Sequence, residues 1–513
     1  MKLQKILFSA LISSFLLSCN DEETSYLENN SSPTNSMALN LKETLSLNQN
    51  SGKELSEQDI LKILEDYVKD INQNSKSCNN TQTRTISKSP KFKVSNKYYL
   101  GDNQTTRSNT TGIKAPVYEV QIDNGNETKG LAIVGGDDRY PVVIAYIPSY
   151  QQENPNKKTE QIPVNTDFML GLSKAVYKDN LEQITSAQTN KKQTIEKIAK
   201  GLNIPVYNVD SQDIDAYIQK YGIERNPVEQ DLTNIETRTD PSSPMDEPAS
   251  KLVRSYGKPC GTEWDQWSPY NLDYPIDWVA ILGPEMCSKT QHPAGCAVTA
   301  IAQIIAALQP GGMTCNGIQM RWDYLKEKKR INAGPFGDID PKDKIDMVSA
   351  LFKDIYDKTN SYPQWGTGSS DEWPPQKVQC VLQTGTNSTN IYNYFSSKSG
   401  VTVVNNNITG MMRWNPEIIR QSLQYSFPVF VGGNGHAFVL DEFLYCTKKL
   451  TTYELIKQYD VYFHANFGWT DTLGNGYYLV KDTQNGTIIF HTGLGDYKDS
   501  DMQILPFIGS RTL

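Results

Sequence analysis

A turn-rich stretch over residues 224–262 divides this chain of 513 residues into two parts. Within it, residues 237–244 include two prolines and show no apolar periodicity, which is typical of an exposed connection between domains. A chain of this length exceeds one ordinary domain, and its hydrophobic content of 38% is enough for each part to bury a core. We therefore predict two domains joined by a linker that a peptidase can cut, the alternative being a plain connection that is never cut.

The part before the linker combines helical and strand-like patterns. Ser56 and Asp59 resemble a helix capping box, and apolar residues follow at helical spacing from Ile60 to Ile71. Short apolar runs predict strands over residues 117–122, 131–134 and 142–147, and helical patterns cover residues 164–178, 191–202 and 211–221. The mixture predicts a small α+β domain over residues 55–223.

The part after the linker also mixes the two patterns. One strongly apolar helix is expected from Cys296 to Leu308, where Pro310 and the two glycines after it end the helix. Strands are expected over residues 429–431, 437–440, 460–466, 477–480 and 487–490. These patterns predict a second α+β domain over residues 263–513.

The N-terminus has the features of a targeting signal. A positively charged start is followed by an apolar run over residues 6–17, which is too short to span a bilayer comfortably. Residues 16–19 resemble a bacterial lipobox, in which Cys19 becomes the lipid-carrying N-terminus, and residues 20–23 resemble the acidic signal that sends some lipoproteins of Gram-negative Bacteroidetes to the cell surface. We expect a signal peptide over residues 1–19, a flexible tether over residues 20–54 and an outer-membrane or cell-surface location, the alternative being an ordinary cleaved signal peptide.

Charge and cysteine spacing narrow the classes of function. The net charge is −8 and no basic block occurs, which does not favour a nucleic-acid partner. No CxxC pair, HExxH helix or Gly-x-Ser-x-Gly elbow is present, so a zinc ribbon, a metallopeptidase and an α/β-hydrolase are not indicated, and we expect neither metal nor cofactor. Six cysteines remain besides Cys19 and Cys296, and they allow 15 connectivities between which the sequence does not choose. These six are Cys78, Cys260, Cys287, Cys315, Cys380 and Cys446.

Cys296 begins the apolar helix and is the candidate nucleophile. A helix N-terminus presents free N–H groups and partial positive charge, which favour the thiolate, the form of cysteine that attacks a carbonyl. Gly295 before it lets a substrate approach the backbone closely. Taken alone, a cysteine on a small-residue helix is more often a buried structural residue, so the hypothesis needs a partner base.

His436 is the best placed of the four histidines to act as that base. It follows the glycine-rich turn at residues 432–435 and opens an apolar strand, which places its ring at the mouth of the strand. His464 is expected to be a half-buried strand histidine, and His292 is expected on the loop before Cys296 without a catalytic role. His491 matches no motif.

Asn466 is the candidate third member of the site. Its side-chain oxygen can accept the imidazole N–H and fix the tautomer of the ring. Trp469 can shield that hydrogen bond from water. Without the other two members, Asn466 would read as an ordinary residue at the end of a strand.

Together these motifs resemble the streptopain family of papain-like cysteine peptidases. The order Cys, His, Asn agrees with that family, and the resemblance extends over residues 264–271, 295–300, 435–439 and 466–469. It implies a catalytic domain made of a helical part and an antiparallel β-sheet. Residues 130–139 and 141–146 resemble the inhibitory prodomain of streptopain precursors. The chain departs from the family at Phe467, where a Trp is usual, and at residues 470–473.

The resemblance also implies further site residues. Gln266 would help the backbone N–H of Cys296 to form the oxyanion hole. The Gly- and Ser-rich residues 366–370 resemble the substrate-cleft loop of the family. The residues implied in substrate binding are Gly366, Gly368, Ser369 and Gly435.

The sequence therefore predicts a cysteine endopeptidase made as a zymogen, with proteins or peptides as substrates and its own prodomain as an intramolecular inhibitor. Cleavage of the linker would free the peptidase domain from the lipid-anchored prodomain. Two alternatives stay open: a Cys–His acyl transferase or amidase, and a surface-anchored binding or peptidase-inhibitor protein.

Overall fold

The computed structural model describes residues 37–48, 51–77, 90–101, 113–125, 129–150, 164–224, 251–281, 286–334, 338–398, 400–433, 435–448, 459–469, 474–481, 487–492 and 495–510. Both parts of the chain are mixed α and β structure, which confirms the predicted fold class. Cys19, Cys78 and the predicted signal peptide lie outside the described residues. Within the ranges given above, no helix is both long enough and apolar enough to cross a membrane.

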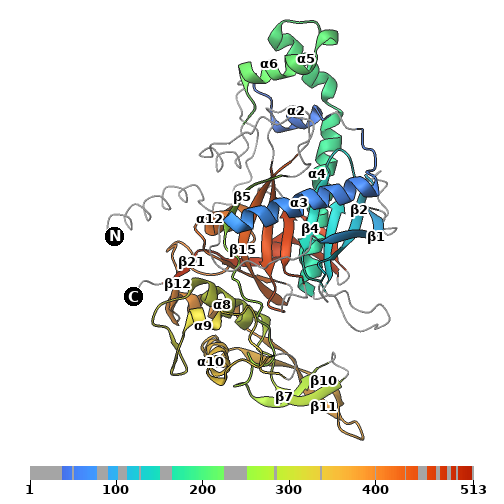
Figure 1. Ribbon diagram of the computed structural model, residues 1–513. Coiled ribbons are helices and arrows are strands. Elements are labelled where there is room, and N and C mark those ends of the chain that lie inside the picture. Colours follow the sequence, from blue (N-terminus) through green and yellow to red (C-terminus); the bar gives the residue numbers. More distant parts are fainter. Residues whose placement is uncertain are drawn as a thin grey trace, which may run out of the picture.

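A four-stranded antiparallel sheet forms the centre of the first part. Its strands, paired in chain order, are β1 (Lys91–Leu100), β2 (Ala115–Asp123), β3 (Lys129–Gly135) and β4 (Val142–Ile147). Helix α3 (Glu57–Ser77) crosses this sheet (Figure 1), and Ile60, Leu64 and Tyr67 bury their side chains in the core that the sheet shares. β1 was not predicted, because its side chains are largely exposed and its lysines make the segment polar in sequence.

Of the other helices of the first part, α2, α5 and α6 lie at one end of the molecule, and α4 runs from that end along the sheet (Figure 1). They are α2 (Leu41–Ser46), α4 (Val164–Gln188), α5 (Lys191–Leu202) and α6 (Ser211–Tyr221), with the short helix η1 (Val206–Asn208). α2 falls within residues 20–54, where a flexible tether was expected. It begins with a capping box of Asn40 and Glu43, and Lys197 Nζ lies 2.7 Å from Glu43 Oε2 and joins it to α5. These residues are therefore docked on the folded body.

In the second part, helix α8 (Cys296–Leu308) packs against an antiparallel sheet. Its bounds are those predicted from the sequence. The sheet strands are β14 (Val429–Gly433), β15 (His436–Thr447), β16 (Tyr459–Asn466) and β17 (Gly476–Val480). Ala437 and Val439 belong to the core that contains α8, whereas Phe438 and Leu440 belong to the core on the other face, as alternation along a strand requires.

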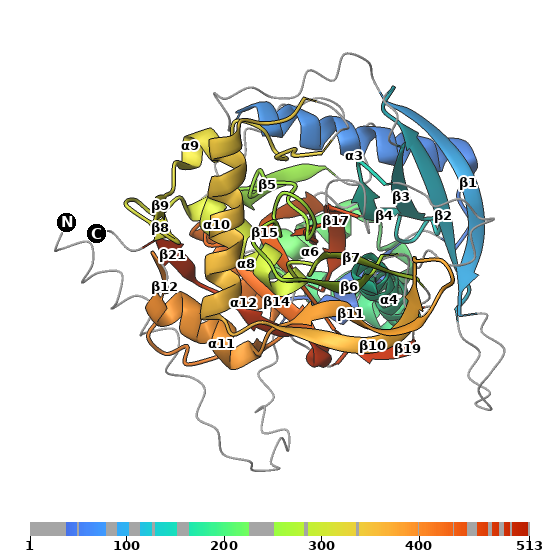
Figure 2. The same cartoon turned by 90° about the horizontal axis from the view of Figure 1, so that it is seen from below.

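The remaining elements surround these two cores (Figure 2). They are α9 (Trp322–Leu325), α10 (Lys342–Lys358), α11 (Ser388–Asn393), η2 (Tyr394–Lys398), α12 (Pro416–Gln424), η3 (Asp499–Asp501), β8 (Thr314–Cys315), β9 (Ile318–Gln319), β12 (Val401–Val403), β13 (Met412–Arg413), β18 (Ile489–Thr492), β19 (Gly495–Lys498), β20 (Gln503–Leu505) and β21 (Ile508–Ser510).

The two central sheets are one continuous sheet. β17 of the second part pairs antiparallel with β4 of the first, through Tyr477 with Tyr146 and Tyr478 with Ala145. Buried side chains add to this junction: Tyr140 donates a hydrogen bond to Asp460 Oδ1 over 2.6 Å, and Tyr462 donates to the carbonyl of Val143 over 2.7 Å. The first part is therefore joined to the second by backbone and side-chain hydrogen bonds.

Two further regions differ from the sequence prediction. Residues 366–370 were expected in a loop but belong to β10 (Tyr362–Ser370), which forms a small closed barrel with β11 (Lys377–Gly385), β6 (Ile276–Ala280) and β7 (Met286–Gln291). In the predicted linker, residues 225–250 lie outside the described residues, but β5 (Leu252–Gly257) pairs with β15. Only part of the range 224–262 is thus left as a connection.

Replacing Tyr140 with Phe should weaken the junction between the two parts. The substitution removes the donor to the buried Asp460 carboxylate, a type of hydrogen bond worth about 1.5–3 kcal/mol. We expect that loss in the free energy of unfolding, measured by urea denaturation in a Cys296→Ala background. Tyr67→Phe is the matched control, since its buried hydroxyl has no hydrogen-bond partner among the described residues. Equal losses in both variants would contradict the assignment.

Candidate active site

Cys296 lies at the first position of α8, with Gly295 as the N-cap. Its thiol is free and only partly exposed. The sulfur accepts hydrogen bonds from backbone N–H groups, among them that of Ala437, which directly follows His436 on β15. The fold therefore brings the predicted nucleophile beside the strand that carries the predicted base.

The electrostatic state of Cys296 differs from the sequence expectation. Burial raises the pKa of the thiol, and the N–H groups of Ala437, Ala297 and Cys296 itself only oppose this effect. The helix N-terminus alone thus does not produce a thiolate, because desolvation of the charged form is the larger contribution.

His436 is held against the loop that follows β16. Its Nε2 lies 3.3 Å from the carbonyl oxygen of Phe467, and its ring stacks on Trp469 with the centroids 6.2 Å apart. Burial lowers the pKa of His436 to about 3, so the imidazole is neutral and donates to that carbonyl. The predicted neighbourhood of His436 and Trp469 is present, and Phe467 contributes its backbone rather than its ring.

Asn466 makes other hydrogen bonds than the one predicted. Its Nδ2 donates to the carbonyl of Thr262 over 2.8 Å, and its Oδ1 accepts from the N–H of Gly468 over 3.2 Å. Both polar atoms of the amide therefore have partners other than the imidazole. Gly468 has φ +68, and a side chain there would meet Thr299 of α8, which fixes this loop against the helix.

Gln266 lies in the segment that runs past the N-terminus of α8. Its backbone carbonyl accepts from Ala294 N–H over 2.8 Å, and its side chain is buried. Thr262 Oγ1 donates to Gln303 Oε1 of α8, 3.2 Å away. The first of these bonds holds Gln266 beside Ala294, two residues before Cys296. No sequence pattern had indicated the contact of Thr262 with α8.

The predicted substrate-binding residues lie on two different elements. Gly366, Gly368 and Ser369 are on β10 of the small barrel, where Gly368 is buried and Ser369 is exposed. Gly435 is exposed with φ +78 and directly precedes His436. Only Gly435 is adjacent in sequence to a predicted catalytic residue, and the backbone conformation there favours glycine.

The other histidines have structural surroundings. His464 Nδ1 lies 2.6 Å from Asp441 Oδ1, and Asp441 Oδ2 accepts from the N–H of Cys260. His292 is buried, with its ring edge-on to Trp365 and neither ring nitrogen hydrogen bonded within the described part of the chain. No group of three or more His, Cys, Asp or Glu among the described residues is arranged to hold a metal ion.

A cysteine at the N-terminus of a buried helix, packed against a sheet strand that begins with a histidine, is the arrangement of a papain-like cysteine peptidase. Residues 264–478 match the model of the Peptidase C10 family. The match to this family of cysteine peptidases confirms the predicted class of enzyme.

Two solved structures are similar to the chain. A mutant fragment of prointerpain A from Prevotella intermedia is 14% identical with a TM-score of 0.40, and the match covers 83% of this chain and 100% of that one. Active wild-type interpain A from the same organism, a cysteine protease, is 15% identical with a TM-score of 0.29, covering 49% and 94%. No curated protein matches the chain.

The raised pKa of Cys296 predicts slow alkylation in the intact chain. With iodoacetamide, the rate at Cys296 should still be rising at the pH where free glutathione has levelled off, because less of the protein thiol is ionised at each pH. Peptide mapping by mass spectrometry separates Cys296 from the other free cysteines. A rate that is already constant at neutral pH would contradict the raised pKa.

The half-buried carboxyl group of Glu442, beside the sheet junction, predicts a contribution to stability that falls as pH rises. Burial raises the pKa of Glu442 to about 7, and Tyr477 donates to its carboxylate over 2.7 Å. Burial opposes the charged form of His464, but the carboxylates of Asp441 and Glu442 together outweigh burial and raise the pKa of His464. Both groups bind a proton more tightly in the folded chain, so stability present at low pH is lost as pH rises through their folded pKa values.

His436 contributes with the opposite sign over part of the interval from pH 4.5 to pH 8, because its lowered pKa means that the unfolded chain binds that proton more tightly. The contribution of Glu442 is therefore measured as a difference: the melting temperature of Glu442→Gln minus that of its Cys296→Ala parent should increase from pH 4.5 to pH 8. Glu65→Gln, at an exposed position of α3, should show no such change. A difference for Glu442→Gln that decreases with pH would show that the sign is wrong.

Proposed function

We propose that this chain is the precursor of a cysteine endopeptidase in which Cys296 is the nucleophile and His436 its base. The observation that carries the proposal is the hydrogen bond from Ala437 N–H to the Cys296 sulfur at the N-terminus of α8. It sets the nucleophile one residue away from His436, across the contact between the helix and the sheet.

In the proposed reaction, His436 takes the thiol proton and the thiolate attacks the carbonyl carbon of a peptide bond. Gln266 and the backbone N–H of Cys296 hold the oxyanion of the tetrahedral intermediate. The protonated His436 then gives its proton to the leaving amine, and water activated by His436 hydrolyses the thioester. Asn466 orients the imidazole during both steps.

The described state accounts for an inactive precursor. Both members of the pair are neutral, since burial raises the pKa of Cys296 and lowers that of His436. His436 bonds to the backbone of Phe467, and the amide of Asn466 bonds to Thr262 and Gly468. Activation in this proposal turns the imidazole away from Phe467 toward Cys296 and the Asn466 oxygen.

The first part of the chain is proposed to act as the inhibitory prodomain. It pairs β4 with β17, the strand that follows the loop holding His436. Gly474, at the end of that loop region, lies so close to Thr166 of α4 that an added Cβ would collide with it. Contacts at Gly474 and along β17 thus support a role for the first part in fixing the chain just beyond the segment that holds His436.

The location of the protein is proposed from the sequence. The lipobox-like residues 16–19 and the acidic residues 20–23 support lipid attachment at Cys19 and display on the cell surface. Cleavage within residues 225–250 would separate the lipid-bearing part from the peptidase and allow its release. Alkaline extraction of membranes, compared between the wild type and Cys19→Ala, tests the anchor.

Self-processing tests the peptidase proposal directly. Residues 20–513 are expressed as wild type and as Cys296→Ala, and chain length and casein hydrolysis are followed under reducing conditions. The wild type should shorten and hydrolyse casein, while Cys296→Ala should stay full length and lose activity by at least about 10⁴-fold, because the nucleophile is gone.

One outcome would contradict this proposal. If both chains stay intact, and cutting within residues 225–250 with an added peptidase unmasks no casein hydrolysis, Cys296 is not the nucleophile of an endopeptidase.

A further inference from the structure

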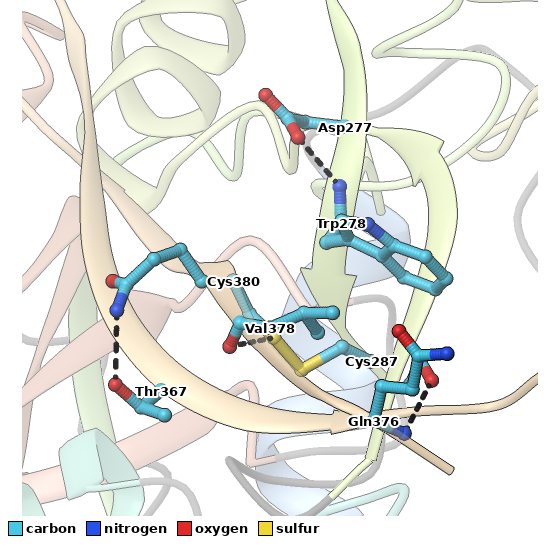
Figure 3. The surroundings of a disulfide bond; sticks show 9 residues. Asp277, Trp278, Cys287, Thr367, Gln376, Val378 and Cys380 are labelled. Atoms are coloured by element: carbon cyan, nitrogen blue, oxygen red, sulfur yellow. Dashed lines mark hydrogen bonds between the residues drawn. A yellow bond between two sulfur atoms is a disulfide. The ribbon is translucent and has the colours of Figure 1, made fainter. Parts of the chain in front are cut away.

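A disulfide crosses the interior of the small barrel of the second part. Strands β7 and β11 are not neighbours in the barrel order β10-β11-β6-β7, yet Cys287 of β7 is bonded to Cys380 of β11 (Figure 3). Both cysteines are fully buried. The bond therefore fixes the β10–β11 hairpin to the β6–β7 hairpin independently of the ladder hydrogen bonds.

The two strands that the disulfide joins lead to Pro293 and Thr384, which contact each other just before the nucleophile. β7 ends at Gln291 and continues directly through His292 and Pro293 to Cys296. On β11, four residues beyond Cys380, Thr384 is buried and its Oγ1 donates to the carbonyl of Pro293 over 2.6 Å. The disulfide and this hydrogen bond thus hold both ends of the same short segment.

Thr384 also makes a close backbone contact at Gly295. A Cβ added to Gly295 would lie 2.9 Å from the carbonyl oxygen of Thr384 and 3.0 Å from its Cβ. Gly295 has φ +93, a conformation that favours glycine. Thr384 therefore determines where the Gly295–Cys296 peptide lies, and with it the direction of the Cys296 N–H and the start of α8.

We propose that Thr384, supported by the Cys287–Cys380 disulfide, is a positioning residue for the proposed nucleophile. It acts through Pro293 and Gly295 and does not touch the reacting atoms. The inference rests on the assignment of Cys296 in the proposed function. A displaced Cys296 N–H weakens oxyanion binding in the transition state, which lowers kcat and leaves KM nearly unchanged.

Three single variants separate the effect of the Thr384 hydroxyl on catalysis from an effect on folding. Thr384→Val keeps the shape and removes the donor, Thr384→Ser restores the donor, and Thr386→Val is the matched control, since Thr386 bonds to Ser361 instead. Assayed after processing, Thr384→Val should lose kcat on the order of tenfold with KM within about twofold, because a small misplacement near the chemistry is costly. Thr384→Ser and Thr386→Val should stay near wild type at an unchanged melting temperature.

The double variant Cys287→Ser/Cys380→Ser tests the support of Thr384. Like Thr384→Val, it should lower kcat. When the two changes are combined, the further loss of kcat should be small, since both act on the position of the same segment before Cys296. Wild-type kcat in Thr384→Val, or equal losses in Thr384→Val and Thr384→Ser, would overturn the role of the hydroxyl. Full additivity would overturn the role of the disulfide.

Alkylation of Cys296 in the unprocessed chain supplies a readout that does not need peptidase activity. The rate of reaction of Cys296 with iodoacetamide should change several-fold in Thr384→Val and not in Thr384→Ser or Thr386→Val. The surroundings of the thiol change only when the hydrogen bond from residue 384 to Pro293 is lost. Such a change in a chain without casein hydrolysis would uphold the positioning contact while the proposed function fails. An unchanged alkylation rate in Thr384→Val, in an enzyme that hydrolyses casein, would overturn the positioning contact while the proposed function stands.

Discussion

Backbone pairing between β4 and β17 is the interaction on which the rest of the structure depends. Through Tyr146 with Tyr477 and Ala145 with Tyr478, it turns two sheets into one and leaves β17 without a free edge. Gly476 permits this approach, since a Cβ there would collide with the Tyr146 carbonyl. Because β17 pairs on its other side with β16, which carries Asn466, the first part of the chain is one strand away from the proposed site.

Burial decides the charge state of that site. A cysteine and a histidine in water-accessible contact can form a thiolate–imidazolium pair, but desolvation favours the neutral form of both. In this structure the Cys296 sulfur accepts hydrogen bonds from backbone N–H groups and His436 donates a hydrogen bond to the Phe467 carbonyl, so each is stabilised separately. In the proposed mechanism, these residues become catalytic when the His436 ring turns away from Phe467.

The sequence predicted those helices and strands that a pattern of neighbouring residues indicates. The apolar run with Pro310 at its end gave α8 its bounds, and the alternating apolar residues gave the cores of β15 and β16. The barrel was missed because its two hairpins, β6–β7 and β10–β11, join through parallel strand pairs across long separations, and the pairing of Cys287 with Cys380 follows from that topology. Residue types identified Cys296 and His436 as candidates, but the partners of Asn466 depend on the backbone of Thr262, which no pattern shows.

Covalent capture of the nucleophile tests the central claim most directly. A peptidyl acyloxymethyl ketone, which alkylates an activated cysteine, is added to the intact and to the processed chain, and the modified residue is identified by mass spectrometry. The account predicts one adduct, on Cys296, in the processed chain and little in the intact chain, where burial raises the pKa of the thiol. An adduct on another cysteine, or casein hydrolysis that persists without any adduct on Cys296, would contradict it.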